Sequence, residues 1–169
     1  MGKFNNKIEA EFDPPRKWVL SRALTYTNPD IDEDALERVG VEIKGSKIAV
    51  KKGFVTDLAS VPRMCWAFIA PWDVARAAII HDLLYKRIRQ YRAECSKSLM
   101  NSEDPKVISA AKKAADDVFH MAMKDAEPPV AKWKIAAAYY SVRMFGRWSI
   151  TPREEDIKRK KSEWPGPGV

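Results

Sequence analysis

The spacing of the apolar residues changes once along the chain, from a period of two to a period near 3.6. Residues 41–50 form two alternating runs around Gly45 and Ser46, which predicts a β-hairpin. From about residue 74 onward, apolar residues recur three and four positions apart, as in amphipathic helices. This single change predicts an α+β fold, in which a small N-terminal antiparallel sheet packs beside a three-helix C-terminal part.

The length of 169 residues suits a single domain, which we place at residues 1–150. Residues 151–169 are predicted to form a short charged helix, opened by a capping box at Thr151 and Glu154, and a tail rich in proline and glycine. Asp73 is a candidate N-cap, and Asp104 with Pro105 is a second helix start. The strands are expected within residues 4–52, and the helices at residues 74–92, 103–125 and 130–147.

Each long helix is expected to turn one apolar stripe toward the core. The stripe of the first helix contains Ala77, His81, Leu84, Ile88 and Tyr91. The stripe of the third helix contains Trp133, Ala137, Tyr140 and Met144. The second helix is rich in alanine and therefore suited to close contact with its neighbours.

Charge and composition exclude several classes of protein. The chain has 30 basic and 23 acidic residues, a net charge of +7, but the basic residues are dispersed, so a nucleic-acid role is disfavoured. No apolar run reaches the ~20 residues of a membrane span, and no signal peptide is evident, so synthesis in a cytoplasm is expected. Cys65 and Cys95 are expected to be reduced, and with His81 and His120 they lack the ligand spacing of a zinc peptidase.

A short acidic segment, Asp30, Asp32 and Asp34, has alternating carboxylates like a calcium loop. It lacks the glycine and the terminal glutamate of an EF-hand. We therefore interpret it as a turn followed by a helix start.

One of the two histidines, His81, lies in the middle of an apolar stripe and is followed by Asp82 and Tyr85. A buried imidazole in this position is either a structural group that locks helices together or a general base held by a carboxylate. Asp116 and Asp117 of the second helix are the candidate carboxylates, at opposite edges of its apolar arc. The sequence predicts that Asp116, or failing it Asp117, forms a hydrogen bond with His81.

Three segments together resemble a family of short phage and prophage proteins that is known only as a domain of unknown function. They are TDLASVP at residues 56–62, HDLLY at residues 81–85 and ADDVF at residues 115–119. The resemblance implies a phage-encoded, virion-associated protein, made in the host cytoplasm and incorporated into the phage particle. Its expected partners are other virion proteins or further copies of itself.

The string His81-Asp82-x-x-Tyr85, followed by Ala115-Asp116-x-x-Phe119, also resembles the two-helix core of secreted and parvoviral phospholipases of the A-two class. This resemblance implies that His81 activates water, that Asp82 binds calcium and that Asp116 orients the imidazole with Tyr85 nearby. It also implies a phospholipid or another ester as the substrate.

The chain departs from those phospholipases because no glycine-rich calcium loop precedes His81. Asp57 is our candidate for a replacement calcium ligand, and we expect residues 56–60 to pass close to His81. Two functions therefore stay open: a calcium-assisted, phospholipase-like or esterase-like hydrolase, and a non-catalytic phage structural or assembly protein with a buried polar lock.

Overall fold

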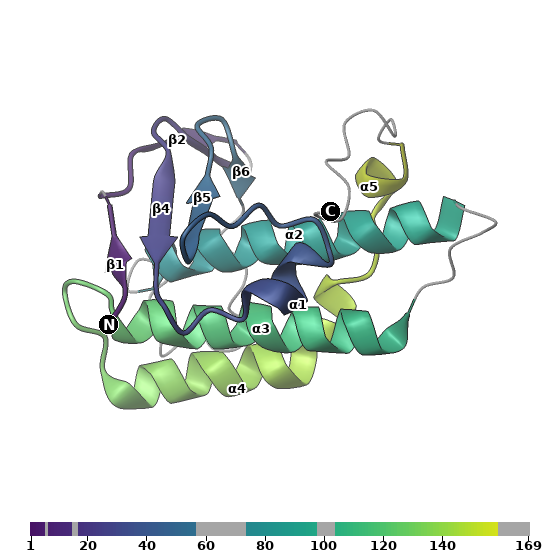
Figure 1. Cartoon of the computed structure of the whole chain (residues 1–169). Helices are drawn as coiled ribbons and strands as arrows, with labels where there is room; N and C mark the ends of the chain where they lie inside the picture. Colours follow the sequence, from purple (N-terminus) through teal and green to yellow (C-terminus); the bar gives the residue numbers. More distant parts are fainter. Residues whose placement is uncertain (6, 15–16, 57–73, 98–103, 159–169) are drawn as a thin grey trace.

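The computed structural model describes residues 1–5, 7–14, 17–56, 74–97 and 104–158 (Figure 1). Within these residues every strand precedes the three long helices, which confirms the predicted α+β class.

The described strands form two three-stranded antiparallel sheets. The first sheet contains, in spatial order, β1 (Lys3–Phe4), β4 (Leu24–Thr27) and β5 (Lys47–Val50). The second contains β2 (Ala10–Asp13), β3 (Lys17–Leu20) and β6 (Val55–Thr56). Alternation along β4 and β5 directs Leu24, Tyr26, Ile48 and Val50 into the core, as expected for strands with one solvated face.

The predicted hairpin at residues 41–50 forms only in part. Gly45 and Ser46 both have a positive φ and make the turn, and β5 follows it. The segment before the turn contributes a single bridge, between Ile43 and Ile48, and β5 pairs along its length with β4. The acidic segment also behaves as predicted: Asp32 accepts a hydrogen bond from the Ala35 amide, 3.1 Å long, and caps α1 (Glu33–Glu37).

The long helices are stacked in layers below the sheets (Figure 1). They are α2 (Ala75–Lys97), α3 (Pro105–Lys124) and α4 (Lys132–Ser149). One side of α2 packs on β4 and β5 and another side packs on α3, while α4 covers the far side of α3. Asp104 caps α3 and Pro105 occupies its first turn, as predicted. None of the described helices is long and apolar enough to cross a membrane.

The predicted inward face of α4 is wrong for three of its four residues, whereas Ala137 is partly buried against the core. Trp133, Tyr140 and Met144 are 56%, 64% and 71% exposed. The buried face consists instead of Ile135, Ala138, Ser141, Val142 and Gly146. Both faces of this helix are apolar enough to be buried, and the face with the smaller side chains is the one that can approach the alanine-rich α3 closely.

A short helix, α5 (Glu154–Lys158), is tied to α2 by a buried ion pair. Arg89 Nε lies 3.2 Å from Asp156 Oδ2, and Arg89 also donates to the Ser149 carbonyl. The sequence predicts a capping box at Thr151 and Glu154, but the observed bond lies two residues later and is only one half of that motif: the Asp156 carboxylate accepts from the Arg153 amide at the helix start. Cys95 is a half-buried free thiol, whereas Asp73, Cys65 and the tail at 159–169 lie outside the described residues.

Candidate functional site

The carboxylate of Asp116 is fully buried and accepts hydrogen bonds from four side chains on three helices. Oδ1 lies 3.0 Å from His81 Nε2 and 2.7 Å from the Tyr85 hydroxyl, both on α2. Oδ2 lies 2.8 Å from Lys112 Nζ on α3 and 3.0 Å from Arg143 Nη1 on α4. The predicted hydrogen bond between Asp116 and His81 is therefore confirmed, and Tyr85 joins it.

The His81 imidazole is only 1% exposed and is enclosed by aromatic rings. Its ring centroid lies 4.0 Å from that of Tyr85 and 4.8 Å from that of Phe119, which is stacked on it. With Nε2 directed at Asp116, the other nitrogen, Nδ1, is buried and has no hydrogen-bond partner among the described residues. A buried polar atom without a partner costs about 1–3 kcal/mol, so this nitrogen is unusual for a purely structural histidine.

Local sequence explains how the three helices bring these groups together. His81 and Tyr85 are four residues apart on α2 and therefore share one face of the helix. Gly146 lies where α4 passes the Tyr85 ring: a Cβ at this position would be 3.1 Å from the Tyr85 Cζ and still closer to the hydroxyl oxygen. The glycine therefore makes room for the hydroxyl that donates to Asp116.

Three of these donors and burial set the ionisation of Asp116. Burial raises the pKa of the Asp116 carboxyl, but the hydrogen bonds from His81, Lys112 and Tyr85 outweigh burial and lower that pKa well below its usual range. Burial, reinforced by the negative charge of Asp116, raises the pKa of Tyr85 far above its usual value. Asp116 is therefore a carboxylate and Tyr85 a neutral donor throughout the physiological range.

The alternative acid, Asp117, does not reach His81. Its carboxylate is half-exposed and lies 2.6 Å from Lys113 Nζ and 2.9 Å from the Tyr139 hydroxyl, on the α4 side of α3. Tyr139 also stacks on the second histidine, His120, with ring centroids 4.6 Å apart. Asp117 is thus part of a separate surface cluster.

The predicted calcium ligands are only partly described. The Asp82 carboxylate accepts a hydrogen bond from the Thr56 hydroxyl, which brings the first residue of the 56–60 segment beside the neighbour of His81. Asp57 lies outside the described residues. No group of three or more histidine, cysteine, aspartate or glutamate side chains that could hold a metal ion occurs in the described part of the chain.

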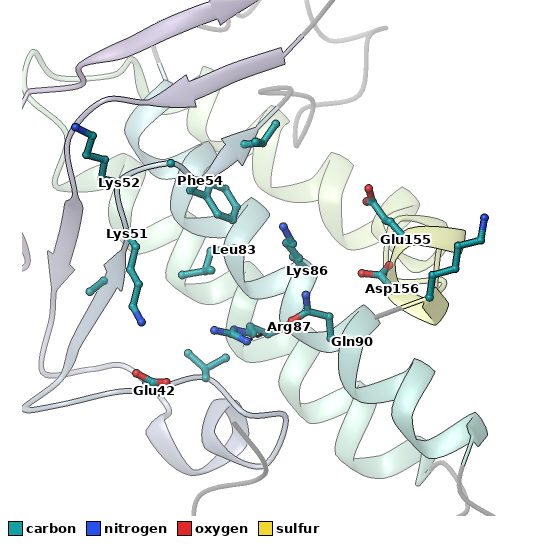
Figure 2. Close-up of a pocket in the computed structure, with 15 residues that line it drawn as sticks. Glu42, Lys51, Lys52, Phe54, Leu83, Lys86, Arg87, Gln90, Glu155 and Asp156 are labelled. Atoms are coloured by element: carbon teal, nitrogen blue, oxygen red, sulfur yellow. Dashed lines mark hydrogen bonds between the residues drawn. The ribbon is translucent and has the colours of Figure 1, made fainter. Parts of the chain in front are cut away.

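His81 lines neither of two large cavities formed by described residues. One, of about 790 Å³, lies between β5, β6, α2 and α5 (Figure 2). Leu83, Lys86 and Gln90 line it from the face of α2 opposite His81, so α2 separates this cavity from the buried pair. The other, of about 920 Å³, lies between the start of the chain and the α3–α4 connection.

Sequence reasoning missed Lys112, Arg143 and Gly146. Lys112 precedes Asp116 by four residues, so the helical spacing of an ion pair was a signal that could have found it. Arg143 and Gly146 lie on another helix and have no local signal that connects them with Asp116 or Tyr85.

The fold and site together define an α+β protein in which a histidine–aspartate pair is buried where three helices meet. The chain belongs to the family described as "Protein of unknown function (DUF1353)", whose model matches residues 36–142. That range includes His81, Tyr85 and Asp116 and stops just before Arg143. No curated protein and no solved structure matches the chain.

Proposed function

We propose that this protein is an ester hydrolase in which His81 is the general base that activates water. The observation that carries the proposal is the asymmetry of the imidazole: Nε2 is held by Asp116, whereas Nδ1 is buried without a partner among the described residues. When Nε2–H donates to the carboxylate, the lone pair is on Nδ1, where a base needs it.

The chemistry follows from these two nitrogens. Nδ1 of His81 removes a proton from water as the water oxygen forms a bond to the carbonyl carbon of the ester. Asp116 stabilises the imidazolium that results, and the Tyr85 hydroxyl keeps the carboxylate in place. Collapse of the tetrahedral intermediate breaks the bond to the leaving oxygen, which takes the proton back from Nδ1. The products are an acid and an alcohol.

The remaining parts of the proposal rest on the resemblances in the sequence. A phospholipid substrate, calcium bound by Asp82 and Asp57, and a phage-encoded protein that associates with the virion all belong to this part. The described residues supply a single carboxylate, Asp82, at the expected calcium position, so the reaction above contains no step through calcium.

A second candidate is a non-catalytic phage structural or assembly protein. It is favoured by the burial of the site, because His81 is 1% exposed and Asp116 is fully buried. In this function the cluster fixes the relative positions of α2, α3 and α4, and no substrate reaches it.

Hydrolysis assays on matched variants separate the two functions. We would measure the release of acid from phospholipid vesicles and from soluble esters, with calcium and with a chelator, for the native chain, His81→Gln and His120→Gln. A hydrolase should lose about 100-fold or more of its activity in His81→Gln and little in His120→Gln, with both variants folded. If the native chain hydrolyses none of these esters and His81→Gln is only less stable, the site is structural.

A further inference from the structure

The outer face of α4 carries a row of large apolar side chains that no described element covers. Trp133, Tyr140, Met144 and Trp148 are 56%, 64%, 71% and 75% exposed, and we call these four residues the α4 stripe. Their spacing of seven, four and four residues places them within about 80° of the helix circumference and along about 22 Å of its length. Exposed apolar rows of this size indicate a binding surface.

The charged residues of α4 itself all have the same sign. The helix contains Lys132, Lys134, Arg143 and Arg147 and no acidic residue. Basic residues lie next to the tryptophan at each end of the stripe: Lys132 and Lys134 beside Trp133, and Arg147 beside Trp148. A partner that fits this face must therefore combine negative charge with an apolar layer.

We propose that the α4 stripe binds the surface of an anionic lipid bilayer. Tryptophan and tyrosine are enriched where an apolar layer meets water, and flanking lysine and arginine are attracted to anionic headgroups. The helix would lie parallel to the membrane plane with the stripe immersed and the basic residues among the headgroups. The binding needs no membrane span.

The position and charge of this face favour a bilayer over a second copy of this chain or a partner protein with a complementary protrusion. The layer arrangement leaves α4 outermost, below α3 (Figure 1), and the four stripe side chains are each more than half exposed, so the stripe projects from the outer layer of the molecule. Two copies packed stripe to stripe would bring their basic residues together, which like-charge repulsion opposes.

The opposite face of the same helix completes the buried site. Arg143 contacts Asp116, and Gly146 contacts Tyr85. A bilayer bound at the α4 stripe would therefore lie about one helix diameter, roughly 10 Å, from the histidine–aspartate pair. The membrane proposal rests on the α4 stripe and its flanking basic residues, and it holds whether or not the site hydrolyses esters.

Vesicle flotation tests the proposal directly. The full chain is mixed with vesicles of phosphatidylcholine alone or of phosphatidylcholine with phosphatidylglycerol, at about 0.15 M salt. We expect binding to the anionic vesicles only. The double variant Trp133→Ser/Trp148→Ser should weaken that binding by about tenfold or more, since both side chains would insert in the interface. Phe12→Ser, at an aromatic residue 52% exposed on β2, is the matched control and should bind normally.

Charge reversal is an independent test, because it leaves the aromatic residues in place. Lys132→Glu/Lys134→Glu should weaken binding by more than about 20-fold, whereas Lys44→Glu/Lys47→Glu changes the net charge equally, outside α4, and should weaken it much less. The proposal is overturned if the native chain does not float with anionic vesicles, or if neither α4 variant differs from its control. It is also overturned if the α4 stripe mediates self-association in gel filtration without any vesicle binding.

Discussion

Replacement of Asp116 by asparagine keeps the size of the side chain and removes the charge on which four donors converge. Oδ1 could still accept from His81 and Tyr85, but an amide NH₂ would face Lys112 and Arg143, which are both donors. Two charge-assisted hydrogen bonds, each contributing about 1.5–3 kcal/mol, are lost. Removal of one partner from a buried ion pair costs about 3–5 kcal/mol, so we expect a destabilisation of that size.

Asp117→Asn is the matched control, at the next residue of the same helix. Its carboxylate is 34% exposed and its partner Lys113 is 65% exposed, so the same chemical change should cost less than about 1 kcal/mol. Thermal and urea unfolding measure both variants. For a chain of this length we expect the Tm of Asp116→Asn to fall by about 6–20 °C, and that of Asp117→Asn by a few degrees at most. Equal losses in the two variants would refute the convergence of donors on Asp116.

Three other outcomes follow from the same site. Gly146→Ala places a Cβ against the Tyr85 ring, so the free energy of unfolding should fall by about 1–3 kcal/mol. Adding Tyr85→Phe should recover part of that loss, and an equal loss with and without the Tyr85 hydroxyl would contradict the contact. Folding lowers the pKa of Asp116, so the contribution of this carboxylate to stability is present above about pH 4 and is lost as the pH falls below that. Urea unfolding at a series of pH values should show this loss in acid for the native chain and a smaller loss for Asp116→Asn. Folding raises the pKa of Tyr85, so its contribution is present below about pH 10 and is lost above it, and Tyr85→Phe should be less sensitive to alkali.

The elements that the sequence predicts well are those with local signals. Asp104 and Pro105 fix the start of α3 through a cap and a restricted φ, and both lie within a few residues of the helix they open. The pairing of His81 with an aspartate of α3 could also be predicted, because the helical period places His81 on a buried face and Asp116 and Asp117 at the two edges of an apolar arc. These signals need no knowledge of the tertiary arrangement.

The predictions that fail depend on a choice between two locally equivalent alternatives. On α4, a face with Trp133, Tyr140 and Met144 competes with a face containing Ile135 and Val142, and hydrophobicity alone favours the larger side chains. The packing distance to the alanine-rich α3 decides for the smaller ones. Arg143 reaches Asp116 only because α4 packs on α3 through the face with the smaller side chains. The fourth hydrogen-bond donor to Asp116 is therefore determined by tertiary packing.

The central claim is that His81 has a hydrogen on Nε2, donated to Asp116, and a bare lone pair on Nδ1. The chain has only two histidines, so ¹⁵N-labelled histidine gives two rings in a long-range ¹H–¹⁵N spectrum, and His120→Gln assigns them. At neutral pH we expect the His81 ring to show a protonated Nε2 and an unprotonated Nδ1. A ring with the hydrogen on Nδ1, or with hydrogens on both nitrogens, would contradict the claim.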